Sequence, residues 1–264
     1  MSHEAINAIK KIMTIFQASE GVIRPHFIVT GPSGSGKSHT IEYLANELDM
    51  VMISVNAAGL TKEGTAGNSL SKALTPLMQH GNTPVICFVD EFDKLFISGN
   101  ANSDLAHETT NGVQNEFLKA LEGSTSVFGD YGKYINIKTD NVLFVFAGAF
   151  NGEENIDLDR LREMGLKTEF LGRVGLAYGL SKVSLEEMED ILNNSPLLEK
   201  YLELFPKVNK DVVVTSLMRV VKDNYEKNTI GVRIINTLLH QYFIEGGIKE
   251  KETKKVTFQK TLEL

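Results

Sequence analysis

The stretch Gly31-Pro32-Ser33-Gly34-Ser35-Gly36-Lys37-Ser38 decides the fold of this 264-residue chain. It fits the G-x4-G-K-[ST] pattern of a phosphate-binding loop. An apolar strand pattern over 26–30 precedes the loop, and a helical pattern over 37–48 follows it. This strand–loop–helix setting is the one in which inward-turned backbone N–H groups and the helix dipole bind an anion.

Two side chains of the loop have expected roles in binding ATP and Mg²⁺. Lys37 can reach the β- and γ-phosphates, and Ser38 can ligate magnesium. We expect the nucleotide to contact residues 31–39, which include His39. A chance Gly/Ser turn is the alternative interpretation, and the strand and helix on either side disfavour it. The loop alone leaves nucleoside kinases and transporter ATPases open as classes.

A second motif, Val85-Ile-Cys-Phe-Val-Asp90-Glu91, is an apolar strand that ends in two carboxylates. Asp90 is expected to hold the magnesium shell, and Glu91 to orient and activate the attacking water. The alternative is that two acids merely cap a strand end. A second acid directly after the magnesium ligand favours water as the acceptor, and therefore an ATPase over a kinase. The signature Leu-Ser-Gly-Gly-Gln of transporter ATPases is absent from the sequence.

Composition narrows the class further. Hydrophobic residues make up 42% of the chain and charged residues 23%, as in soluble globular proteins, and no stretch is apolar enough for a membrane span. The net charge of −7 disfavours a protein that mainly coats nucleic acid. Cys87 is the only cysteine, which predicts a buried, unreactive thiol and a reducing cytoplasm. The scattered histidines give no structural metal site.

The chain divides into an α/β part and a smaller helical part. Apolar strand patterns over 51–55, 85–89 and 142–146 alternate with helical ones, which predicts a parallel sheet covered by helices on both faces. The large domain is expected over 1–180, with an amphipathic helix within 1–24, and a small, mostly helical domain over 181–264.

Within the small domain, six elements are predicted. They are a helix from the capping box at Ser184, a segment between Pro196 and Pro206, a strand over 211–214 before a helix capped by Thr215 (216–227), a helix after Gly231, and a strand over 255–258.

Further motifs occur in order between about residues 27 and 245. They are Asp90-Glu-Phe-Asp93-Lys94, Gly112-Val-Gln-Asn-Glu-Phe-Leu-Lys-Ala-Leu-Glu-Gly123, Val142-Leu-Phe-Val-Phe-Ala-Gly-Ala-Phe150, Glu169-Phe-Leu-Gly-Arg173 and Gly231-Val-Arg233. In these stretches the chain resembles the ClpX/HslU family of AAA+ unfoldases. The resemblance implies a AAA+ P-loop NTPase with a helical lid, specific for ATP, that assembles as a homo-oligomer, expected to be a hexameric ring.

The resemblance also implies roles for two arginines. Arg173 resembles the arginine finger that reaches the γ-phosphate of a neighbouring subunit, and Arg233 resembles the sensor-2 arginine that contacts nucleotide in its own subunit. A surface arginine that caps a helix is the alternative for Arg173, and a helix-surface ion pair is the alternative for Arg233.

The chain departs from the family at the positions that would contact a threaded polypeptide. The axial loop of the family carries an aromatic residue, whereas this chain has Gly64-Thr65-Ala66-Gly67. The stretch 123–140 corresponds to a second axial loop and offers Phe128, Tyr131 and Tyr134 as substrate contacts. The alternative is a surface hairpin whose aromatic residues pack on its own base.

Other departures suggest a minimal form. Residues 151–168 leave only a short connector where relatives dock a peptidase, so no ClpP-type partner is expected. About 25 residues precede the first strand, which leaves no place for the zinc-binding domain. Ala147-Gly148 stand where a polar sensor is usual, and Asn151 is the nearest polar candidate.

We therefore expect an ATP-hydrolysing ring motor that unfolds, remodels or disassembles a protein client. A scaffold whose assembly is gated by nucleotide is the first alternative, followed by a nucleic-acid motor and then a small kinase. The protein is expected to be located in the cytoplasm of a bacterium or of a phage-infected host cell, and no membrane partner is expected.

Overall fold

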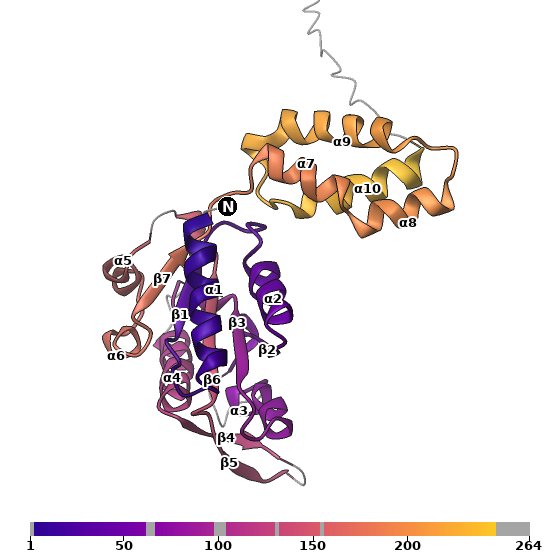
Figure 1. Ribbon diagram of the computed structural model, residues 1–264. Coiled ribbons are helices and arrows are strands. Elements are labelled where there is room, and N and C mark those ends of the chain that lie inside the picture. Colours follow the sequence, from indigo (N-terminus) through magenta and orange to yellow (C-terminus); the bar gives the residue numbers. More distant parts are fainter. Residues whose placement is uncertain (1–2, 62–66, 98–103, 130–131, 154–155, 247–264) are drawn as a thin grey trace, which may run out of the picture. The chain divides into compact units, whose positions relative to one another are not determined.

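The computed structural model describes residues 3–61, 67–97, 104–129, 132–153 and 156–246 (Figure 1). The chain forms two compact units. The first comprises residues up to Ser184 together with Thr229–Val232, and the second comprises Leu185–Asn228 and the residues from Arg233 onward. Across the described residues, no helix combines the length and apolarity that a membrane crossing requires.

A five-stranded parallel sheet forms the centre of the first unit. Its strands lie in the order β2-β3-β6-β1-β7. Their bounds are β1 Phe27–Thr30, β2 Val51–Asn56, β3 Val85–Asp90, β6 Val142–Gly148 and β7 Leu176–Gly179. The predicted parallel α/β fold is confirmed, as are the four strands expected in it. The edge strand β7 was not predicted, because its four residues are only partly buried and show no clear pattern.

Helices cover both faces of this sheet, as predicted (Figure 1). On one face, α1 (His3–Ala18) and α2 (Lys37–Glu47) pack against alternate strand residues such as Val29 and Val145. On the other face, α4 (Asp104–Leu121) and shorter helices pack against residues such as Ile28 and Phe146. The wholly apolar β6 is buried along its full length because both of its faces are covered.

Short elements complete the first unit. The helices are α3 Leu70–Ala73, α5 Leu158–Glu163 and α6 Thr168–Leu171, and the 3₁₀ turns are η1 Ala57–Gly59, η2 Thr75–Gln79, η3 Phe92–Leu95 and η5 Phe150–Gly152. The strands β4 (Ser124–Phe128) and β5 (Tyr134–Lys138) form an antiparallel hairpin. The short connector expected over 151–168 contains the six-residue helix α5. The side chain of Asp157 caps this helix and accepts the Arg160 N–H at 2.7 Å.

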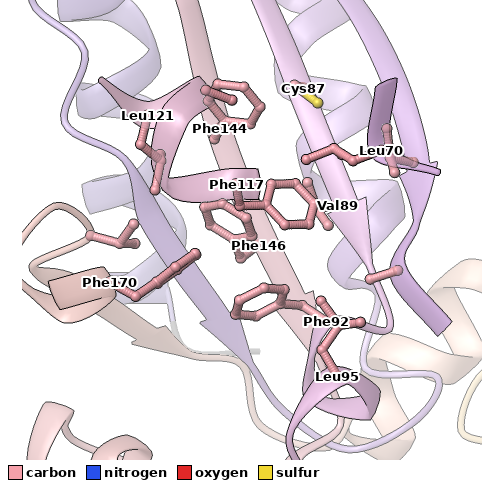
Figure 2. Packing of buried hydrophobic residues seen from close by; sticks show 14 of the residues in the cluster. Leu70, Cys87, Val89, Phe92, Leu95, Phe117, Leu121, Phe144, Phe146 and Phe170 are labelled. Carbon is pink, nitrogen blue, oxygen red and sulfur yellow. The ribbon is translucent and has the colours of Figure 1, made fainter. Parts of the chain in front are cut away.

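Aromatic packing fixes the turn that follows β3. The ring centroid of Phe92 lies 4.6 Å from that of Phe146 and 5.1 Å from that of Phe170 (Figure 2). All three side chains are fully buried. Cys87 lies in the same layer, so its predicted burial is confirmed, and this burial raises the pKa of its thiol.

The second unit is helical in its described part. Its elements are α7 Leu185–Asn193, α8 Pro196–Leu204, α9 Lys210–Asn224, η6 Tyr225–Lys227 and α10 Arg233–Glu245. The helix after the capping box, the segment that begins at Pro196 and the helix after Gly231 are confirmed. The strand predicted over 255–258 lies outside the described residues.

The strand predicted over 211–214 is wrong, because these residues form the first turn of α9. The Asn209 side chain caps the helix and accepts the backbone N–H of Asp211 at 2.8 Å. Val213, Leu217 and Val221 then recur at helical spacing and are buried. Burial of this face outweighs the strand preference of the valine run, so Thr215 lies inside the helix and does not cap it.

The buried side chain of His26 makes the stability of the first unit depend on pH. Its Nδ1 accepts the backbone N–H of Phe144 at 3.1 Å, and its side chain is buried beside that residue's ring. Burial, and secondarily the Arg24 charge, lower the pKa of His26 to about 4 from 6.5. The folded state therefore keeps this imidazole neutral.

We predict that the free energy of unfolding falls by about 3 kcal/mol between pH 6.5 and pH 4 because of His26. The sign follows because the unfolded chain binds the proton first as the pH falls. Denaturant unfolding at several pH values would measure this. The matched control is His26→Asn, which retains an acceptor for the Phe144 N–H but cannot titrate, and should show a shallower pH dependence. Equal slopes in both proteins would contradict the prediction.

Candidate active site

The ends of three neighbouring strands bring the predicted site residues to one edge of the sheet. Thr30, the last residue of β1, pairs in register with Gly148 of β6. Asp90, the last residue of β3, lies beyond the pairing of Val89 with Phe146. Since β6 lies between β1 and β3, its end lies between the phosphate loop and the acidic pair. The carboxyl edge of such a sheet is the usual place for a ligand.

The backbone of the phosphate loop requires glycine at two positions. Gly31 has a φ of +145°, and an added β-carbon there would lie 2.2 Å from the Leu180 carbonyl oxygen. Gly34 has a φ of +72°, and its β-carbon would lie 2.2 Å from the Ile230 carbonyl oxygen. The buried Ser35 hydroxyl has no hydrogen-bond partner among the described residues. A loop without β-carbons and with a spare donor fits a phosphate chain.

Lys37 and Ser38 begin α2 and face this loop. The Lys37 ammonium donates to the carbonyl oxygens of Gly31 at 2.7 Å and Pro32 at 2.9 Å. Ser38 Oγ lies 3.4 Å from Asp90 Oδ2, so a hydroxyl and a carboxylate from different elements converge. Oxygen ligands of this kind suit magnesium, which these two side chains would hold. His39 follows them on α2 and is exposed.

Glu91 lies in the turn after β3 in a strained conformation. Its φ is +53°, its side chain is exposed, and its backbone N–H donates to Asp90 Oδ1 at 2.9 Å. Its carbonyl oxygen accepts the Lys94 N–H at 3.0 Å. A non-glycine residue in the left-handed region costs on the order of 1 kcal/mol, and such strain concentrates at functional sites. The turn directs an accessible carboxylate next to the residue that would hold the metal.

Arg173 follows α6 and has two contacts within its own chain. One guanidinium nitrogen pairs with the Glu122 carboxylate at the end of α4, and another donates to the Glu169 carbonyl oxygen at 3.1 Å. The second contact is of the helix-capping kind expected as the alternative. Arg233 is the first residue of α10 in the second unit and is exposed.

The two aromatic residues of the hairpin that the structure describes lie against each other. The Phe128 and Tyr134 rings are 5.6 Å apart in an edge-to-face arrangement, and the Lys72 ammonium lies 5.5 Å from the Phe128 ring centre. This pair lies next to the hairpin's turn and not at its base, and Tyr134 is 54% exposed. Tyr131 and residues 64–66 of the axial loop lie outside the described residues, and Gly67 follows them.

Sequence reasoning gave no separate role to two polar residues at this edge. Ser35 was predicted only as one of the nucleotide contacts within residues 31–39, and Asp93 appeared only as part of a motif. Both are buried with an unpartnered oxygen in the described structure. The position of this acid between the aromatic residues 92 and 96 is the sequence signal that could have indicated a buried carboxylate. Asn151, the predicted substitute sensor, is exposed and has a φ of +57°.

Comparison with known proteins agrees with this geometry. The model of the AAA family, "ATPase family associated with various cellular activities", matches residues 27–167, more than half of the chain. The chain is also similar to proteins named "ATP-dependent Clp protease ATP-binding subunit ClpX". It is 25% identical to the one from Borrelia duttonii (strain Ly) over 90% of this chain and 26% identical to one from Porphyromonas gingivalis (strain W83) over 89%.

A third such protein, from Treponema denticola, is 27% identical over 83% of this chain. The matches span 66%, 68% and 55% of these relatives' own lengths, so the chain covers just under two thirds of the first. The predicted resemblance to ClpX is confirmed. Because the family model matches more than half of the chain, including the phosphate loop and the acidic strand end, the chain belongs to the AAA family of ATPases.

Proposed function

We propose that this protein is a AAA+ motor that hydrolyses ATP to remodel, unfold or disassemble a protein client. The observation that carries the proposal is the convergence of Ser38, Asp90 and Glu91 at one sheet edge beside the phosphate loop. The ClpX-named relatives support the protein-remodelling part of it.

Each residue at this sheet edge has a separate role in ATP hydrolysis. The loop N–H groups and Lys37 bind the β- and γ-phosphates, for which Lys37 leaves its carbonyl partners. Magnesium, when bound by Ser38 and Asp90, would supply positive charge to the phosphate oxygens. Glu91 accepts a proton from water as the water oxygen attacks the γ-phosphorus. The bond to the bridging oxygen breaks, and ADP and inorganic phosphate are released.

The assembly that we propose is a homo-oligomeric ring, hexameric as in the resembled family. Arg173 would reach the γ-phosphate in the neighbouring subunit, and Arg233 would contact the nucleotide of its own subunit. Arg173 is 38% exposed, so its guanidinium is accessible to a neighbour. A guanidinium has five N–H donors, and its two contacts leave others for phosphate oxygens. We propose no peptidase partner and no nucleic-acid substrate.

The hairpin β4–β5 is the proposed client contact. A cavity of about 340 Å³ lies between the hairpin, α3 and α4, and Leu70, Lys119 and Tyr134 are among its lining residues. An exposed tyrosine beside a cavity with apolar and charged walls suits an unfolded polypeptide, which offers both kinds of side chain.

We predict that Tyr134→Ala weakens client binding by roughly fivefold or more, because aromatic contacts contribute about 1 kcal/mol or more at interfaces. Fluorescence anisotropy with an unfolded protein and a slowly hydrolysed ATP analogue would measure the affinity. Tyr43→Ala is the matched control, since Tyr43 is 59% exposed on α2 on the opposite face of the sheet. An equal affinity in both variants would rule out the hairpin as the contact.

The direct test of the proposed function is capture of the client. Glu91→Gln should bind ATP and stall before hydrolysis, so a client should remain bound when the variant is isolated with ATP from native extract. A specific protein whose folded state changes with ATP in the unmutated enzyme supports remodelling. Captured nucleic acid would favour a nucleic-acid motor, and an assembly that functions without hydrolysis would favour the nucleotide-gated scaffold.

A further inference from the structure

Asp93 is a buried carboxylate that the mechanism above does not use. It lies in η3, directly after the turn that carries Glu91, and is 1% exposed. Its Oδ2 accepts the backbone N–H of Phe150 at 3.1 Å. Its Oδ1 is buried and has no hydrogen-bond partner in the described part of the chain. The nearest recorded cation is the half-exposed ammonium of Lys94, 3.7 Å from Oδ2.

Burial of such a carboxylate has an unfavourable free energy. Transfer of a charged group from water costs several kcal/mol unless hydrogen bonds and counter-charges replace the lost hydration, and Asp93 has one hydrogen bond and one solvent-screened cation. Phe92 and Leu95, on either side of it, are buried and fix the turn, as Figure 2 shows. The apolar anchors would hold this turn without an acid, so the carboxylate calls for another explanation.

The Asp93 hydrogen bond joins two strained turns of the active site. Glu91, two residues earlier, has a φ of +53°, and on the other strand end Phe150 and Asn151 have φ values of +47° and +57°. Left-handed non-glycine residues persist where surrounding contacts impose them. The bond from Asp93 to the Phe150 N–H is a side-chain contact that ties the turn after β3 to the turn after β6.

The Asp93 carboxylate fills the space that a side chain on Gly148, at the end of β6, would need. A β-carbon on Gly148 would lie 2.6 Å from Asp93 Oδ1 and 2.8 Å from the Phe150 ring. Gly148 does not have a positive φ, so its backbone would tolerate a side chain. What excludes the side chain is the space that Asp93 and Phe150 fill. A carboxylate from the neighbouring turn thus lies beside the end of β6.

We propose that Asp93 is a positioning residue for ATP hydrolysis, which holds the Glu91 turn and the end of β6 in a fixed relation. This inference rests on the proposed role of Glu91. Displacing a catalytic group by about 1 Å costs roughly a hundredfold in rate, whereas nucleotide affinity depends on the phosphate loop, which Asp93 does not contact among the recorded hydrogen bonds and ion pairs. Loss of the Asp93 hydrogen bond therefore lowers kcat and leaves nucleotide binding intact.

The test compares Asp93→Ala, Gly148→Ala and Phe117→Leu with the unmutated enzyme. Steady-state hydrolysis gives kcat and KM, a fluorescent ATP analogue gives nucleotide affinity, and thermal unfolding gives stability. We expect Asp93→Ala to lower kcat by about ten- to a hundredfold with the nucleotide Kd within about threefold. Gly148→Ala, which forces the carboxylate aside without removing it, should lower kcat in the same direction.

Phe117→Leu is the matched control, because it alters the same core layer without touching the Asp93 hydrogen bond. It should lower thermal stability while kcat stays within about twofold. Asp93→Asn, which retains an acceptor for the Phe150 N–H, should recover part of the lost kcat.

Three results would overturn the proposal. They are a kcat within twofold of the unmutated value in Asp93→Ala, a parallel loss of nucleotide affinity, or an equal loss of kcat in Phe117→Leu. If Asp93→Ala does not fold, Gly148→Ala decides by the same criteria. Glu91→Gln distinguishes a failure of the proposed function from a failure of this inference. If Glu91→Gln hydrolyses ATP at the unmutated rate, the proposed function fails. If Glu91→Gln is inactive and Asp93→Ala is fully active, only the role of Asp93 is refuted.

Discussion

Glu91→Gln should lower the steady-state rate of ATP hydrolysis by about a hundredfold or more and leave ATP binding intact. Glutamine has nearly the same size but does not accept a proton from water. The Glu91 side chain is exposed, and the strained turn is held by backbone and core contacts that the substitution leaves in place. Phosphate release measures the rate, and the rise in melting temperature with added ATP measures binding.

Two variants give this experiment its controls. Lys37→Ala should lose both hydrolysis and the ATP-dependent rise in melting temperature, because Lys37 contacts the phosphate-binding loop itself. Glu189→Gln changes an exposed glutamate on α7 and should hydrolyse ATP at the unmutated rate. Unchanged turnover in Glu91→Gln would mean that another group activates the water.

The phosphate loop and the acidic strand end could be predicted because their information is local. In each case a run of residues fixes its own backbone, as in the strand–loop–helix around Lys37 or the apolar strand before Asp90. The two motifs assigned Ser38 and Asp90, 52 residues apart, to the same magnesium ion, but they did not give the 3.4 Å between the two side-chain oxygens. That distance depends on the order of strands in the sheet.

The first turn of α9 shows how local preference can mislead. Three consecutive valines favour a strand when considered alone. In the structure, all three lie on α9, where Val213 and Val214 are buried and Val212 is 55% exposed. The cap supplied by Asn209, one residue before the helix, was the available signal for a helix start.

Contacts between distant segments were beyond sequence reasoning altogether. The side chains of Asp93 and Glu122 reach Phe150 and Arg173, which lie 57 and 51 residues away in the chain. Neither pair follows a periodic pattern, and each depends on how loops meet at the sheet edge. Gly148 illustrates the same point, because the need for glycine there can be explained only from the position of Asp93 in the structure.

Arg173→Ala should lower ATP turnover by about a thousandfold in the assembled protein, since an arginine supplied by a neighbour stabilises the charge on the transferring phosphoryl group. The substitution should change stability little. Arg173 and Glu122 are 38% and 53% exposed, and exposed ion pairs contribute about 0–1 kcal/mol. Turnover and thermal unfolding of the same preparation would separate a catalytic loss from a loss of folding.

Mixing two inactive variants would show whether Arg173 acts on its own subunit or on the next. Glu91→Gln keeps Arg173, and Arg173→Ala keeps Glu91, so only an interface between unlike subunits in the correct order holds both groups. In randomly mixed, equimolar rings with head-to-tail interfaces, turnover should recover to about a quarter of the unmutated rate. A mixture that stays inactive, although its rings assemble, would place Arg173 in its own subunit's site or in a structural role at the end of α6, where the Glu169 carbonyl already holds it.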